Sequence, residues 1–171
     1  MVAAARRGEE GKTIQADPAA AFLPEPGRCN NTAMRRAMRR VSQLYDAALA
    51  PSGLRSTQRS ILVSIARAGN PSMGELAAVL VLDRSALAHN LKPLEREGLI
   101  KLAADVCDKR SKRVTLTAKG RIKLRQSMAH WEQAQRKLES ALGVDKARRL
   151  RATLDYIASL EFDDPHSKHQ T

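Results

Sequence analysis

The stretch from Asp108 to Gly120, DKRSKRVTLTAKG, decides how this chain folds. It begins with four cations within five residues: Lys109, Arg110, Lys112 and Arg113. Val114 and Leu116 then alternate with threonines, a spacing typical of a half-buried β-strand. After Gly120 the apolar residues follow helical spacing. The stretch therefore predicts a basic β-hairpin followed by a helix.

The residues before the hairpin predict a pair of helices. Ser72–Glu75 (SMGE) is a capping-box pattern that opens a short helix through Leu80. Asp83 is expected to cap the next helix, which Gly98 ends. Three leucines of that helix share one face, Leu87, Leu91 and Leu94. A helix pair followed by a basic hairpin is the order of a winged helix-turn-helix, in which the second helix enters a DNA groove.

Longer helical patterns flank this unit, at about 32–50, 121–142 and 145–160, and a further helix is expected at 56–68. Their apolar faces exceed what a small winged helix covers, which predicts a two-fold dimer. The alternative is that these helices only pack against each other. We expect a mostly α fold with a small β-hairpin wing, divided as follows: a disordered or loosely attached segment (1–28), helical dimerisation segments (29–50 and 121–162), a winged helix-turn-helix (51–120) and a loose tail (163–171).

Charge points to a polyanionic partner. The chain holds 30 Lys and Arg against 18 Asp and Glu, a net charge of +12. Residues 1–27 hold three basic and four acidic residues, so the excess lies in the part expected to fold. Only 3% of the residues are aromatic, which favours duplex DNA over stacked single strands. A solvated charged surface is the alternative.

Several other classes of protein find no support in the sequence. No apolar run is long enough to span a membrane, and no signal peptide is recognisable, so we expect a cytoplasmic protein. Two cysteines and four histidines form no cluster with metal-ligand spacing. The chain has no catalytic Ser-His-Asp or Cys-His pattern and no phosphate-binding glycine loop. We therefore expect no enzyme, no cofactor and no metal.

Four motifs together resemble the MarR family of bacterial transcriptional regulators. In order they are Leu54–Gln58, Leu82–Ser85, Leu94–Ile100, and Asp108–Arg110 with Leu116–Gly120. The resemblance covers roughly Thr32–Leu160. It implies a helical homodimer that binds a pseudo-palindromic operator, most often as a repressor relieved by a small molecule or by oxidation. It also implies a ligand site between the dimerisation helices and the DNA-binding lobe.

The chain departs from the family pattern in the two elements that would contact DNA. The recognition helix carries Ala86 and His89 where Thr and Arg are frequent. Pro93 lies within that helix and is expected to disturb the preceding turn. In the wing, Asp105, Asp108 and Arg110 match a common Asp-x-Arg-Asp-x-Arg pattern, but Cys107 replaces its first Arg.

We predict that the recognition helix, about 83–97, reads the major groove and that the wing, about 104–116, lies at the minor groove. Arg110 is expected in the minor groove and Asp108 is expected to orient it. The predicted contacts of the helices are Ser72, Arg84, Ser85, Ala86, His89, Asn90 and Lys92; the predicted phosphate contacts of the wing are Lys109, Lys112 and Arg113. A solvent-facing role is the alternative for Arg110 and His89.

Two regulatory sites follow from the resemblance. Six residues are candidates for an effector pocket: Met38, Arg39, Tyr45, Ile65, Met128 and Trp131. Their alternative role is core or interface packing. Cys29, near four arginines of the first long helix, is a candidate for oxidation, and an incidental thiol is the alternative. Cys107 is a weaker candidate for oxidation.

The sequence thus predicts a homodimeric, sequence-specific regulator, with double-stranded operator DNA and a small-molecule effector as partners. The alternative is an architectural DNA-binding protein with little sequence preference and no effector. The ratio of specific to non-specific affinity separates these two classes.

Overall fold

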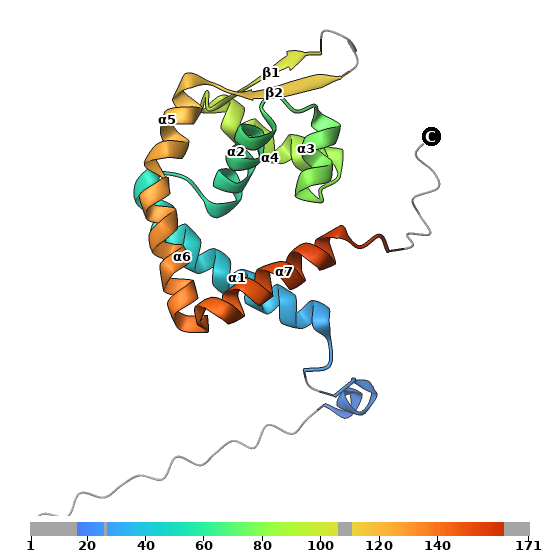
Figure 1. Ribbon diagram of the computed structural model, residues 1–171. Coiled ribbons are helices and arrows are strands. Elements are labelled where there is room, and N and C mark those ends of the chain that lie inside the picture. The colour runs from blue at the N-terminus through green and yellow to red at the C-terminus, as the bar shows by residue number, and fades with distance from the viewer. Residues whose placement is uncertain (1–16, 26, 106–110, 163–171) are drawn as a thin grey trace, which may run out of the picture. The chain divides into compact units, whose positions relative to one another are not determined.

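The computed structural model describes residues 17–25, 27–105 and 111–162 (Figure 1). It is mostly helical, with one antiparallel hairpin. The elements in chain order are η1 (Pro18–Phe22), α1 (Asn30–Leu49), η2 (Ala50–Ser52), α2 (Ser56–Ala68), α3 (Met73–Leu80), α4 (Arg84–Arg96), β1 (Ile100–Ala104), β2 (Lys112–Leu116), α5 (Ala118–Gln126), α6 (Met128–Leu142) and α7 (Val144–Ser159). No helix in the described ranges is long and apolar enough to cross a membrane.

The chain divides into two compact units, residues 1–38 and 39–171. The first contains η1 and the beginning of α1, and the second contains everything from the rest of α1 onward. η1 lies in a segment for which the sequence predicts no regular structure. It is a five-residue 3-10 helix, with a bond of 2.8 Å from the Ala20 amide to the Asp17 carbonyl and one of 3.2 Å from the Leu23 amide to the Ala20 carbonyl. A 3-10 helix this short is held by local hydrogen bonds and produces no apolar periodicity in the sequence.

The predicted helix-turn-helix is present, and its two capping motifs are confirmed. The Glu75 amide donates to Ser72 Oγ at 3.2 Å, and Glu75 Oε2 accepts from the Ser72 amide at 2.7 Å. Asp83 Oδ1 accepts from the Ala86 amide at 2.7 Å. These bonds satisfy backbone donors that a helix leaves open at its first turn, and so they set where α3 and α4 begin.

The core of the second unit joins α2, α3, α4 and the hairpin. Its buried members are Leu54, Ile61, Leu62, Ile65, Leu76, Ala77, Leu87, Leu91, Leu94, Leu99, Ile100 and Val114. Burying one leucine or isoleucine side chain stabilises the fold by about 1.5–3 kcal/mol. The leucine face predicted for α4 therefore packs inward, as expected.

Pro93 does not interrupt α4, although a disturbed turn was expected there. The helix is continuous from Arg84 to Arg96. Leu91 and Leu94, on either side of the proline, are 1% and 0% exposed. We attribute the continuity to this burial, because it holds both flanks of Pro93 in the core.

The hairpin pairs Ile100 with Leu116 and Leu102 with Val114. Its second strand is also joined to the α2–α3 connection, because the Val114 amide donates to the Pro71 carbonyl at 2.9 Å. An isolated bridge links Ser72 and Arg113 beside that bond. The predicted strand from Val114 is confirmed, and it is anchored on both of its edges.

The single long helix expected from Arg121 to about Leu142 is two helices. α5 begins earlier, at Ala118, because the Gly120 amide donates to Thr117 Oγ1 at 3.0 Å and caps it. α5 ends before Ser127, which is fully buried. The Ser127 hydroxyl donates to the Leu124 carbonyl at 2.6 Å, a local bond that competes with the helical pattern.

Gly120 is a point of close approach between α5 and the hairpin. A β-carbon on Gly120 would lie 2.0 Å from the carbonyl oxygen of Leu99. This oxygen accepts from the Thr117 amide at 3.0 Å, so the backbone has little freedom to retreat. Only glycine fits here.

We expect Gly120→Ala to destabilise the protein by about 1–3 kcal/mol, because the added methyl group meets backbone. Gly74→Ala is the matched control, since its β-carbon would meet only Arg84 Nη2 at 3.7 Å and Ser72 Oγ at 3.9 Å. That change should be neutral or stabilising by up to about 1 kcal/mol. Urea unfolding measures both, and equal stabilities of the two variants would contradict the close approach.

Candidate nucleic-acid interface

The face of α4 opposite its buried leucines is polar and exposed. Of the predicted contacts on this helix, Ala86 is half-buried and five are exposed: Arg84, Ser85, His89, Asn90 and Lys92. They supply two cations, a hydroxyl, an imidazole and an amide, the groups that bond to base edges and phosphates. Burial of the leucines thus presents these side chains together on one surface.

The N-terminal ends of α3 and α4 lie close to each other. Arg84 lies next to Gly74, since a β-carbon added to Gly74 would be 3.7 Å from Arg84 Nη2. Arg84 therefore lies beside the first turn of α3, which Ser72 caps. A helix N-terminus and a guanidinium are both suited to a phosphate.

The carboxylate of Asp83 is held in its ionised form. Its bond from the Ala86 amide is the main cause that lowers the pKa of Asp83 below its ordinary value of 3.8. An ionised cap at this position also favours the dipole of α4. The negative charge is thus engaged by the helix backbone at the edge of the candidate interface.

Part of the predicted wing lies outside the described residues, namely Cys107, Asp108, Lys109 and Arg110. The roles assigned to them stay predictions. Of the described wing cations, Lys112 is exposed at the start of β2. It makes no ion pair with any residue in the described ranges.

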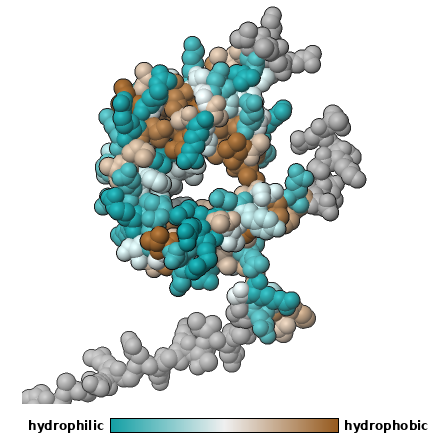
Figure 2. Space-filling view, viewed as in Figure 1, coloured by the Kyte–Doolittle hydropathy of each residue, from teal (hydrophilic) through white to brown (hydrophobic). Residues whose placement is uncertain are grey.

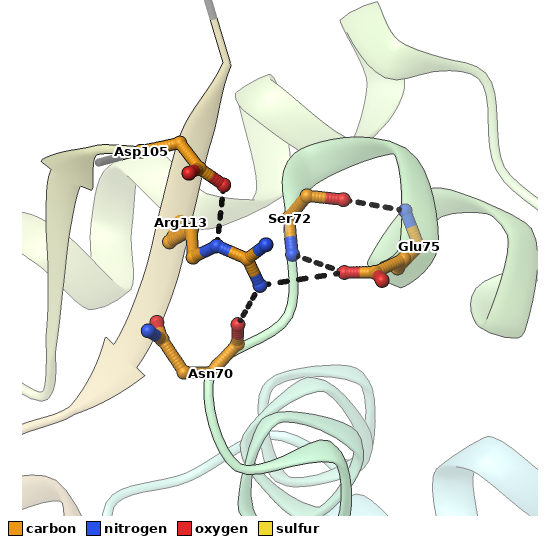
Figure 3. Close-up of polar contacts among 5 residues, drawn as sticks. All are labelled: Asn70, Ser72, Glu75, Asp105 and Arg113. Atoms are coloured by element: carbon orange, nitrogen blue, oxygen red, sulfur yellow. Dashed lines mark hydrogen bonds and ion pairs between the residues drawn. The ribbon is translucent and has the colours of Figure 1, made fainter. Parts of the chain in front are cut away.

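Arg113 behaves differently from Lys112, because protein acceptors hold its guanidinium (Figure 3). Its Nε donates to Asp105 Oδ2 at 2.5 Å, and its Nη1 donates to the Asn70 carbonyl at 2.8 Å. Nη1 also lies 3.8 Å from Glu75 Oε2. The prediction that Arg113 contacts phosphate overlooked these partners. Asn70 and Glu75 lie about forty residues from Arg113, so no local motif marks the contact.

Arg59 is a residue that the sequence did not single out. It is 8% exposed, and its guanidinium lies 4.7 Å from the ring centroid of Trp131. Nε donates to Ser127 Oγ at 3.2 Å and Nη2 approaches Met128 Sδ at 3.0 Å. Burial is the main cause that lowers the pKa of Arg59. In the sequence Arg59 is an isolated cation in an amphipathic helix.

The predicted effector residues have different surroundings in the structure, and their role in binding an effector stays a prediction. Ile65 is fully buried in the core, and Tyr45 donates to Gln135 Oε1 at 2.5 Å. Met128 and Trp131 do come together, but around Arg59. Met38 and Arg39 are exposed and fall on either side of the boundary between the two units. Of the six, Ile65 is therefore a core residue, the role given above as the alternative.

A cavity of about 430 Å³ lies between α2, β2 and α5. It is lined by Ala66, Gly69, Thr115, Leu116, Arg121, Leu124, Arg125 and Met128. Figure 2 shows apolar residues gathered beside α5 below the hairpin, with hydrophilic residues around them. Of the predicted effector residues, Met128 alone lines this cavity. Its lining combines apolar side chains with two arginines, Arg121 and Arg125.

Cys29 is exposed and precedes α1 by one residue. Its Sγ accepts from the Thr32 amide at 3.5 Å. Hydrogen bonding to Thr32 is the main cause that lowers the pKa of the Cys29 thiol, which favours the thiolate. Its role in oxidation stays a prediction. Within the described ranges no group of three or more His, Cys, Asp or Glu is placed to hold a metal ion.

Comparison with known proteins identifies relatives of this chain. The model of the MarR family matches residues 54–112. The M. tuberculosis transcriptional regulator MosR, solved in complex with DNA, is 37% identical to this chain. The match covers 76% of this chain and 93% of the MosR chain, and the two structures superpose with a TM-score of 0.70. No curated protein sequence matches the chain.

Two further solved structures share the fold at lower identity. A cysteine-to-serine mutant of E. coli MarR in complex with operator DNA is 23% identical, covers 83% of this chain and 99% of its own, and has a TM-score of 0.70. Bordetella bronchiseptica BpsR, whose DNA binding is regulated by 6-hydroxynicotinic acid, is 19% identical, covers 81% and 99%, and has a TM-score of 0.72.

We expect Asp83→Ala to lower the urea midpoint at pH 7, because α4 loses its cap, whereas Asp83→Asn should retain most of the stability. Since the folded pKa of Asp83 lies below 3.8, the advantage over alanine is present at neutral pH and is lost as the pH falls through the folded pKa. Unfolding midpoints from pH 7 to pH 2 measure this. If the unfolding midpoints of the wild type and Asp83→Ala differ by the same amount at every pH, the ionised carboxylate has no such role.

Proposed function

This chain belongs to the MarR family of DNA-binding transcriptional regulators, and on that premise we propose that it is a homodimeric repressor of a pseudo-palindromic operator. The observation that carries the proposal is the exposed polar face of α4 opposite its three buried leucines. A helix held in this way presents base-reading side chains on a rigid support. The DNA-bound state of MosR, its relative at 37% identity, supports the same use of the fold.

The dimer is supported by α7, which buries only Ala147 within the chain. Leu150 and Leu154, one helical turn apart, are 43% and 42% exposed, and Leu160, at the C-terminal cap of α7, is 38% exposed. Apolar surface of this extent marks an interface, and a second copy of the chain is the simplest partner. A two-fold dimer would present two copies of α4 to major grooves one helical turn apart.

On the recognition helix, Asn90 is suited to bidentate pairing with adenine and Ala86 to contact with a thymine methyl group. His89 can donate to a base or a phosphate. Lys112, together with Lys109 of the predicted wing, would contact phosphate and so contribute affinity without specificity. Arg110 is assigned to the minor groove and Asp108 to its orientation, as the resemblance implies.

The cavity between α2, β2 and α5 is our candidate for the effector site. Its volume of about 430 Å³ suits a small molecule, and its apolar lining with Arg121 and Arg125 favours an aromatic acid. An effector there would touch both the wing, through Leu116, and the helix α5. A ligand that favours one arrangement of these elements by about 1.4 kcal/mol changes operator affinity tenfold. Oxidation of Cys29 is the second, separate route to regulation.

The first test is selection from random duplex DNA, followed by titration of the winning sequence against bulk DNA. We expect a pseudo-palindrome with half-sites about ten base pairs apart, bound at least 10³-fold more tightly than competitor. Size measurement of the complex should give two protein chains per site. If no sequence is enriched and affinity depends steeply on salt, the protein is an architectural DNA-binding protein instead.

The second test probes the cavity with 6-hydroxynicotinate and with its uncharged carboxamide. We expect the acid to weaken operator binding and the carboxamide to do so much less, because Arg121 and Arg125 attract the carboxylate. Arg125→Gln should diminish the effect of the acid, whereas Arg136→Gln, on an exposed ion pair of α6, should leave it unchanged. If the acid weakens operator binding equally in Arg125→Gln and Arg136→Gln, the cavity is not the effector site.

A further inference from the structure

We propose that Arg113 is a positioning residue for DNA binding, a side chain that fastens the wing to the start of α3 and does not itself contact phosphate. The proposal rests on the DNA-binding function above. It concerns three sequence segments that meet at one guanidinium: the α2–α3 connection, the end of β1 and the start of β2 (Figure 3).

The guanidinium bonds in two directions. Toward the wing, Nε donates to Asp105 Oδ2 at 2.5 Å. Toward the helix-turn-helix, Nη1 donates to the Asn70 carbonyl at 2.8 Å and lies 3.8 Å from Glu75 Oε2. The planar guanidinium holds its donors in fixed directions, so one side chain fixes all three acceptors relative to one another.

The contacts of Arg113 join the hairpin to the start of α3. Asp105 directly follows β1, and its amide donates to the Ser111 carbonyl at 2.9 Å. The clasp formed by Asp105 and Arg113 therefore lies beside the two residues, Asp105 and Ser111, that flank in sequence the segment carrying the predicted Arg110. Glu75 meanwhile caps α3 through the Ser72 amide. Arg113 thus links the base of the wing to the N-terminus of the helix pair.

Backbone bonds alone fix this junction only in part. The Val114 amide bonds to the Pro71 carbonyl, and Ser72 forms a single bridge with Arg113. Both of these backbone contacts lie at neighbouring residues of β2, 113 and 114. The Arg113 side chain adds contacts to Asn70, Glu75 and Asp105, which join β2 to residues on either side of it.

Charge argues against a phosphate contact at Arg113. Its side chain is 38% exposed, and two carboxylates share its single positive charge. Asp105 is only 8% exposed and Glu75 is 64% exposed beside it. A phosphate at this guanidinium would also approach the Glu75 carboxylate. The neighbouring Lys112 is exposed and has no ion-pair partner among the described residues, so it is the better phosphate contact and a matched control.

The experiment compares Arg113→Gln, Arg113→Lys, Asp105→Asn and the control Lys112→Gln in the full chain. Affinity for the selected operator and for random duplex DNA is measured as a function of salt. Unfolding midpoints and the size of the free protein establish that each variant is folded and assembled. Should Arg113→Gln fail to fold, Arg113→Lys and Asp105→Asn carry the test.

A positioning role predicts about a tenfold loss of operator affinity in both Arg113→Gln and Asp105→Asn, and a smaller loss on random DNA. Arg113→Lys should fail to restore binding, because an ammonium group cannot reach all three acceptors. The salt slope should stay unchanged in these variants. In Lys112→Gln the salt slope should fall by about one, because this variant cannot neutralise the phosphate that Lys112 binds.

A phosphate contact predicts the opposite pattern. Arg113→Lys would then bind like the wild type, Arg113→Gln would lower the salt slope, and Asp105→Asn would bind as well as the wild type or better. Any of these results would overturn the proposal.

Amide hydrogen exchange of the free protein tests the clasp without DNA. We expect faster exchange in 100–104 and 112–116 of Arg113→Gln and Asp105→Asn, with α4 and α6 unchanged. Unchanged exchange in the hairpin would overturn the proposal. If the wild type binds no duplex DNA while the hairpin responds as expected, the proposed function fails and the clasp stands as a structural contact only.

Discussion

Burial of the leucine face of α4 is the constraint on which the rest of the interface depends. Leu87, Leu91 and Leu94 are each at most 1% exposed, in a core shared with α2, α3 and the hairpin. A helix has two faces, so fixing one of them fixes the other. The core therefore fixes the backbone that carries the polar side chains of α4. This arrangement lets a surface vary for recognition while the support beneath it is unchanged.

The connection between α2 and α3 is where the helix pair and the hairpin become one structure. Ser72 and Glu75 satisfy the first turn of α3, while Pro71 accepts a backbone bond from β2. Arg113 adds a side-chain bridge to the same place. Nearby cations consequently have different chemistry: Lys112 faces solvent, whereas Arg113 is held by carboxylates and a carbonyl. The net charge of the chain indicates attraction to DNA. Which cations are available to contact DNA depends on whether other groups of the protein already hold them.

Short-range features were predicted well from the sequence. The bounds of α2, the capping box at Ser72 and the cap at Asp83 depend on residues within four positions of each other, and all are present. The single helix expected across Ser127 was wrong because its interruption involves a buried hydroxyl that also bonds Arg59. The effector residues were placed by helical spacing, which does not distinguish core packing from a cavity lining. The roles of Asp108, Lys109 and Arg110 stay predictions.

By itself the sequence determined the order of elements, the faces of the helices and the basic character of the hairpin, because apolar periodicity and capping act over a few residues. Tertiary structure alone decided that Arg113 meets Asn70 and Glu75, that Arg59 lies over Trp131, and that Gly120 touches the Leu99 carbonyl. Each of these contacts joins residues that are more than twenty positions apart. Such pairs are brought together by the packing of whole elements, and no local pattern records which side chains will then face each other.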